Sequence, residues 1–129
     1  MNLEYIRNIN GYDEHAIRLS DFDSGQAMRL RNTIERMVEE GKGNILLSTL
    51  DFIQAVNCTL ILRTAPEDAG ITTVDNKSFF CDLTTGSYKH LLELMEPFCR
   101  KESKGYQWLY DIDTPIGFLF SAGKDLPEK

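Results

Sequence analysis

The stretch DSGQAMRLRNTIERMVEEG, residues 23–41, predicts the element around which the rest of the fold is arranged. Its apolar residues recur at the spacing of one helix face, while its arginines and glutamates mostly take other faces. The apolar positions are Ala27, Leu30, Ile34, Met37 and Val38. Asp23, with Gln26 three positions later, resembles a capping box, and Gly41 is typical of the residue that ends a helix. We therefore expect an amphipathic helix between Asp23 and Gly41.

A second amphipathic helix is expected from about Thr84 onward. Its apolar stripe consists of Tyr88, Leu91, Leu92, Met95, Phe98 and Cys99. Pro97 falls inside this stripe. Because an interior proline removes one backbone hydrogen bond and clashes with the carbonyl of Glu93, the sequence predicts a kink or break at Pro97.

Segments rich in β-forming residues flank both helices, and turn residues separate them in pairs. Three hairpins are predicted in this way: residues 3–9 with 15–19 around Asn10 and Gly11, residues 71–74 with 78–83, and residues 106–112 with 116–120. Residues 44–47 and 58–64 are further expected strands, whereas residues 50–56 suit a helical turn as well as an extended segment.

Together these elements predict an α+β fold with a mainly antiparallel sheet and two amphipathic helices packed on one face. A chain of 129 residues fits one domain, which we expect to cover residues 1–129. A domain of this size buries enough surface to fold without a metal or a disulfide.

The two halves of the chain show a possible internal duplication, about residues 1–63 and 64–123. A shift of 61 residues places Thr84 on Asp23, so that both helices share a start and a buried stripe. Each half is then predicted to run strand, strand, helix, strand, strand. Any two amphipathic helices can be aligned by their stripes, however, and along the helices only Gly25 with Gly86 and Glu35 with Glu96 are identical. Duplication and coincidence both stay open.

The charge balance of the chain bears on its partners and location. Fourteen Lys and Arg against twenty Asp and Glu give a net charge of -6, which repels phosphate backbones and anionic lipid. We therefore expect neither nucleic acid nor a membrane as partner. The N-terminus lacks the apolar core of a signal peptide, and no apolar run is long enough to span a bilayer, so a cytoplasmic location is expected. The odd number of cysteines, Cys58, Cys81 and Cys99, suits buried, reduced thiols.

Metal, cofactor and nucleophile motifs are not found in the sequence. His15 and His90 lie far apart and belong to no ligand motif. The segment that begins at Asp21 resembles the opening of a calcium loop, but Asn32 stands at the twelfth place, where an acidic ligand is needed. No glycine-rich turn leads from a strand into a helix, as a phosphate cradle requires. We therefore predict no catalytic, cofactor-binding or metal-binding residues.

Asp111 and Asp113 form the one carboxylate pair that merits a separate hypothesis. Two residues apart at a strand end, their side chains would share a side and could work as an acid and a base if both were enclosed. The adjoining Thr114 and Pro115 favour a hydrated turn, in which aspartate bonds to the local backbone. The turn is the preferred interpretation.

The aromatic residues of the last hairpin are its most distinctive feature. They are Tyr106, Trp108, Tyr110, Phe118 and Phe120, which we expect to pack beneath the helices, with Leu109 and Leu119 on the opposite face. Leu60 and Leu62 likewise alternate with Ile61, so both faces of the sheet look partly apolar. Helices on one face alone would leave an apolar surface, which a homodimer through the sheet face or a different protein partner would cover.

Three segments, IRLSDFD at residues 17–23, FFCDLT at 79–84 and GYQWL at 105–109, resemble small uncharacterised bacterial proteins. The resemblance implies a stand-alone domain and carries over no functional residue. The leading hypothesis is a non-enzymatic protein-interaction or binding module, because no convergent catalytic group is visible. A small enzyme, or a regulatory domain that binds a small ligand, remains the alternative if residues assemble only in three dimensions.

Overall fold

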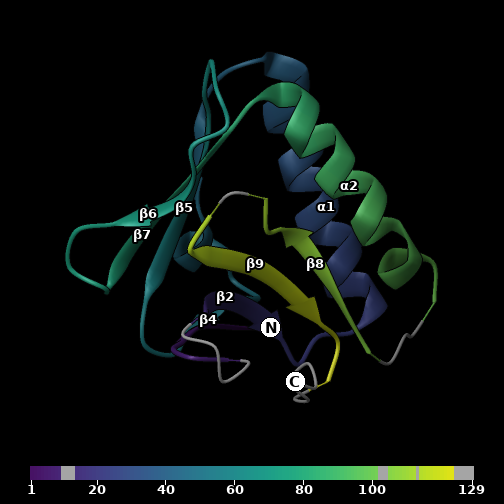
Figure 1. Ribbon diagram of the computed structural model, residues 1–129. Coiled ribbons are helices and arrows are strands. Elements are labelled where there is room, and N and C mark those ends of the chain that lie inside the picture. The colour runs from purple at the N-terminus through teal and green to yellow at the C-terminus, as the bar shows by residue number, and fades with distance from the viewer. Residues whose placement is uncertain (10–13, 102–104, 113, 124–129) are drawn as a thin grey trace.

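The computed structural model describes residues 1–9, 14–101, 105–112 and 114–123 (Figure 1). Two helices lie side by side, and two sheets lie on the same side of both of them (Figure 1). The helices and strands are β1 (Asn2–Ile6), β2 (His15–Ser20), α1 (Ser24–Glu40), β3 (Asn44–Leu46), the 3₁₀ turn η1 (Leu47–Thr49), β4 (Gln54–Ala55), β5 (Thr59–Thr64), β6 (Gly70–Thr73), β7 (Ser78–Leu83), α2 (Thr85–Arg100), β8 (Tyr106–Tyr110) and β9 (Ile116–Ser121).

Helix α1 begins and ends where the sequence predicts. The Asp23 side chain accepts a hydrogen bond from Gln26 N, and the Gln26 side chain accepts one from Asp23 N, so the capping box is confirmed. Gly41 has a φ of 72°, a left-handed conformation that glycine adopts without a Cβ clash. Its N–H donates to the carbonyls of Met37 and Val38, which satisfies the last turn.

Helix α2 does not end at Pro97, and in this respect the prediction of a break is wrong. The helix continues to Arg100, three residues beyond the proline. Phe98 and Cys99 follow Pro97 directly, and both are buried in the core. The free energy gained by burying these two side chains offsets the loss of the one backbone hydrogen bond that proline removes near the helix end.

The α+β class is confirmed, but the strands form two mixed sheets instead of one antiparallel sheet. We call them sheet A, with the order β4-β1-β2-β9-β8, and sheet B, with the order β3-β5-β7-β6. The three predicted hairpins are present as antiparallel pairs. Parallel pairing of β2 with β9 and of β5 with β7 joins distant parts of the chain. Local turn signals cannot reveal such pairs, because they connect strands through long crossovers.

The two halves of the chain follow the same order of elements. The first contains β1, β2, α1, β3 and β5, with η1 and β4 in addition, and the second contains β6, β7, α2, β8 and β9. Each sheet joins the opening hairpin of one half to the closing pair of the other. Neither half can therefore complete a sheet by itself. A duplication in evolution stays a prediction.

The main core lies between the helices and the inner faces of the two sheets. Phe120 of β9 stacks on Phe22 with 4.2 Å between ring centroids and meets Phe98 of α2 at 5.1 Å. The hydroxyl of the buried Tyr88 lies 2.6 Å from Cys81 O and 2.9 Å from Arg63 O, so its proton is shared between two strands of sheet B. These contacts hold α2 to both sheets.

The prediction that the aromatic residues of the last hairpin share one face of the sheet is wrong. Phe118 and Phe120 lie in the main core as predicted, but Leu109 joins them there instead of opposing them. Trp108 is paired with Leu119 across the strands and packs on the other face of sheet A. The physical reason is that directly opposed residues of an antiparallel pair share a side, and an irregularity between Trp108 and Tyr110 shifts the alternation.

Candidate functional site

The two histidines lie in separate parts of the structure. His15 in β2 accepts a hydrogen bond at Nδ1 from Asn8 N, over 2.9 Å. His90 in α2 is exposed and lies 3.7 Å from Glu93. Within the residues that the structure describes, no three His, Cys, Asp or Glu side chains are grouped so that they could hold a metal ion. Asp23, which the calcium-loop hypothesis would have used, caps α1.

The carboxylate pair of the last turn is only partly visible. Asp111 is exposed directly after β8, whereas Asp113 lies outside the described residues. The acid/base hypothesis for this pair therefore stays a prediction.

All three cysteines are buried thiols. Burial raises the pKa of Cys58 to about 11 and that of Cys81 to about 12, and it also raises the pKa of Cys99. The thiolate is the nucleophilic form of cysteine. Because these thiols stay protonated near neutral pH, they are poor candidates for covalent chemistry.

The outer face of sheet A, which points away from the helices, is covered by the chain itself. Ile9, Ala16 and Leu119 form a small buried cluster there, against which Trp108 packs. A Cβ atom on Gly117 would lie only 2.7 Å from the Trp108 ring, so glycine is needed for this close approach. Arg18 on this face is only 8% exposed to solvent, and its guanidinium pairs with the Glu4 carboxylate at 2.7 Å.

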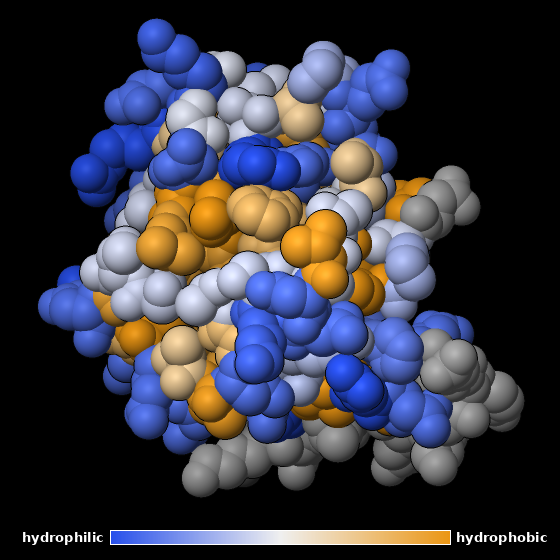
Figure 2. Space-filling view, turned by 90° about the vertical axis from the view of Figure 1, so that its left-hand side faces the viewer, coloured by the Kyte–Doolittle hydropathy of each residue, from blue (hydrophilic) through white to orange (hydrophobic). Residues whose placement is uncertain are grey.

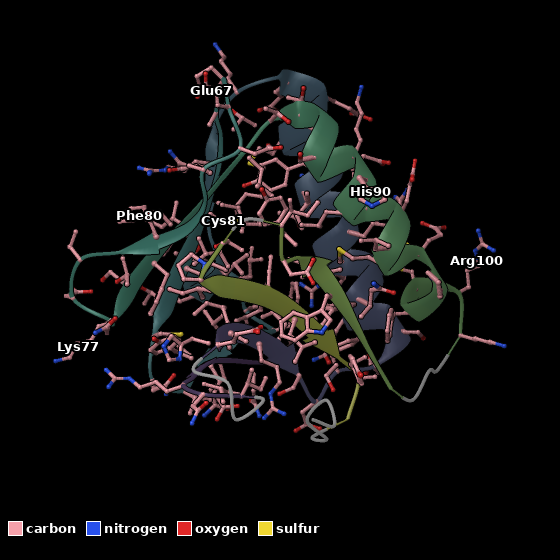
Figure 3. All side chains as sticks on the ribbon, in the orientation of Figure 1. Glu67, Lys77, Phe80, Cys81, His90 and Arg100 are labelled. Carbon is pink, nitrogen blue, oxygen red and sulfur yellow. The ribbon has the colours of Figure 1, made fainter. Side chains whose placement is uncertain are left out.

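Within the described residues, the outer face of sheet B is open and carries partly exposed apolar side chains on three of its four strands. The register places Leu46 opposite Ile61, Ile61 opposite Phe80, and Phe80 opposite the exposed Thr72, so the row crosses all four strands. Phe80 projects away from the helices, whereas the next residue, Cys81, points towards them (Figure 3). On this side of the molecule hydrophobic residues gather between hydrophilic bands (Figure 2). We call the set Leu46, Ile61, Thr72 and Phe80 the sheet B row.

One ion pair accompanies the sheet B row. The Arg63 guanidinium donates to both carboxylate oxygens of Asp82, over 2.6 and 2.7 Å, and lies 4.3 Å above the Phe80 ring. Such a bidentate pair is geometrically defined, and the arginine also stacks on the aromatic ring. The open face thus combines apolar surface with one positive and one negative group.

A groove of about 600 Å³ separates α2 from β8. It is lined by Asp68, Gly86, Ser87, His90, Leu94, residues 107–110, Asp111 and Ile112. Asp68 accepts hydrogen bonds from Thr84 N at 2.8 Å and from Ser87 Oγ at 2.6 Å. These bonds hold the pKa of Asp68 below its usual value of 3.8, and the bond from Ser87 has the larger effect. The groove therefore contains a carboxylate that is ionised at neutral pH.

Sequence reasoning anticipated part of these surfaces. Alternation in β5 placed Ile61 on the face opposite Leu60 and Leu62, but Phe80 and Leu46 were not linked to it because the partners of β5 were unknown. The groove was missed entirely, since Asp68 comes from a loop and its bonds to the start of α2 leave no local signal.

Comparison with protein-family models, curated proteins and solved structures gives no significant match for this chain. Neither helix of the described part is long and apolar enough to cross a membrane.

Proposed function

We propose that this protein is a non-enzymatic interaction domain that pairs with a second copy of itself through the outer face of sheet B. The sheet B row carries the proposal, because it leaves apolar side chains without the covering that the chain provides on sheet A. Apolar surface of this kind on a protein marks an interaction site.

Charge favours a second copy as the occupant. Two chains of net charge -6 repel each other, and the repulsion is smallest where the approaching surfaces are neutral. The open face offers such a surface, since Arg63 and Asp82 cancel. A two-fold contact brings the same patch of both copies together, so each Arg63 can approach the partner's carboxylate as well as its own. The face is self-complementary in charge.

The size of the face sets the expected strength of pairing. The four strands of sheet B are three to six residues long. At a spacing of about 4.8 Å between strands they give a face of roughly 300 Å². A standard interface buries about 800 Å² per partner. The dimer is therefore weak, with a dissociation constant in the micromolar range.

The enzymatic alternative has less support in the described residues. Ser87 is the hydroxyl nearest to an acid, but its proton is donated straight to Asp68 over 2.6 Å. A carboxylate whose pKa is lowered is a weak base, and nucleophilic catalysis needs a base matched to its task. The buried thiols stay protonated.

Sedimentation velocity at protein concentrations from roughly 5 to roughly 500 µM tests the proposal, since this range brackets the expected constant. We expect the mass to rise from 14.7 kDa towards twice that value. Phe80→Glu places a charge in the sheet B row and should keep the chain monomeric. Val56→Glu is the matched control, because Val56 is an exposed apolar residue outside the row.

Circular dichroism establishes that both variants are folded. A wild-type chain that stays monomeric at the highest concentration overturns the proposal, including when a different protein is later found on this face. Dimerisation of folded Phe80→Glu at wild-type concentrations overturns it as well.

A further inference from the structure

We propose that the groove between α2 and β8 binds an extended peptide segment that carries a lysine or arginine side chain. This site is separate from the face that pairs two copies, because β8 belongs to sheet A and α2 covers the inner side of the sheets. The segment would add to sheet A as a further strand beside β8.

The first observation is the backbone of β8. It is the last strand in the order of sheet A. Ala122 N donates to Gly105 O, so the alternation of an antiparallel pair turns the Trp108 carbonyl to the side away from β9. There it accepts a hydrogen bond from the side-chain amide of Gln107, at 3.0 Å. A side chain can release this carbonyl to an incoming strand, which makes β8 a template for strand addition.

The second observation is the opposite wall of the groove. Gly86, Ser87, His90 and Leu94 line it from α2, and His90 is seen on the front of that helix in Figure 3. The distance from Gly86 to Leu94 along the helix is about 12 Å. Four to five extended residues cover the same length. The groove thus has the length for a short strand, with Leu94 and the exposed Ile112 available to its apolar side chains.

The third observation is that the chain fills the corresponding flank of α1 with its own segment. Arg29 stands six residues after the cap Asp23, as His90 stands six after the cap Thr84. Arg29 pairs with Asp51 at 2.7 Å and lies 4.4 Å above the Phe52 ring. A segment of chain therefore packs against α1 at this position. The same position of α2 borders the groove.

Charge selects the chemistry of the ligand. Asp68 and Asp111 line the groove, and among the described residues no lysine or arginine lines it. Both carboxylates lie at the same end of the groove, because the Tyr110 ring lies against Gly70. Asp111 directly follows Tyr110 in the chain, and Asp68 stands two residues before Gly70. A basic side chain at this end meets two acidic groups, which favours cationic over anionic peptides.

A displayed library of random heptapeptides, selected on the immobilised full chain, tests this proposal. We expect selected peptides to be enriched in Lys and Arg and, once synthesised, to shift the fluorescence of Trp108, the single tryptophan, which lines the groove. Methylation of alternate backbone nitrogens on one edge of the peptide should abolish binding, whereas methylation on the other edge should leave it intact.

Two charge variants complete the test. Asp111→Lys alters an exposed groove residue and should weaken binding of the selected peptides about tenfold. Glu67→Lys changes the net charge equally but does not line the groove, and should change affinity by less than about twofold. The proposal is overturned if no peptide is enriched, if neither methylation pattern matters, or if Asp111→Lys binds as well as Glu67→Lys. Dimerisation is measured separately, so either proposal can fail alone.

Discussion

The outer faces of the two sheets are built alike, but the chain covers the apolar residues of one and leaves those of the other partly exposed. Each has central strands that pair in parallel, β2 with β9 in sheet A and β5 with β7 in sheet B. Each also carries one arginine–carboxylate pair. On sheet A, Ile9 and Trp108 close over the strands, and Leu119 is fully buried. On sheet B, the corresponding apolar residues stay partly exposed.

The difference shows how this domain separates stability from interaction. A face that the chain covers itself contributes to folding, because its apolar surface leaves water when the chain folds. A face that stays open contributes little to folding and keeps its apolar surface for association. Equivalent substitutions should therefore cost more free energy of unfolding on sheet A than on sheet B.

Truncation of a central apolar residue on each face should give the largest difference. Leu119→Ala should lower the free energy of unfolding by about 3 kcal/mol, because it leaves a cavity in a closed cluster. Ile61→Ala should cost about 1 kcal/mol in the monomer, since its partly exposed side chain loses less buried surface. Urea unfolding of dilute protein measures both. Equal costs would contradict the distinction between the faces.

Removal of the arginine from each ion pair should give a smaller difference. The Arg18 side chain is only 10% exposed. Arg18→Met removes the partner of the mostly buried Glu4 carboxylate and should lower the free energy of unfolding by about 2 kcal/mol. Arg63 is 42% exposed, and Arg63→Met should cost about 1 kcal/mol or less.

Thermal or urea unfolding at low and high salt checks these two values. Salt should weaken the contribution of Arg63 more than that of Arg18, because exposed pairs are screened more strongly. A larger cost for Arg63→Met than for Arg18→Met would mean that the open face is the more important one for folding.

The sequence predicted local features well and long-range ones poorly. Asp23, Gln26 and Gly41 specify the ends of α1 through bonds to the nearby backbone, so these ends could be read from residue types alone. The three hairpins were also predictable, because their turns lie between the paired strands. The parallel pairs β2–β9 and β5–β7 join residues far apart, and no local pattern encodes which strands will meet.

The candidate surfaces depend on those long-range pairs. The partly apolar second face was predicted from alternation around Ile61, but the row with Leu46 and Phe80 exists only once β3, β5 and β7 are neighbours. Trp108 was predicted to lie with Phe118 and instead covers sheet A, because the pairing of β8 with β9 sets it opposite Leu119. The groove beside α2 requires Asp68 and β8 to meet, which the sequence does not indicate.

Pairing of two copies through sheet B is tested most directly by a distance between spin labels at Lys77→Cys. Lys77 is an exposed residue in the turn between β6 and β7, at the rim of the open face, and the native thiols are buried and protonated. Labels should therefore attach to the introduced cysteine. Double electron–electron resonance at roughly 200 µM should give one distance below about 40 Å, given the dimensions of the face. This distance should vanish when Phe80→Glu is added. A decay without dipolar modulation in the singly labelled chain would contradict the account.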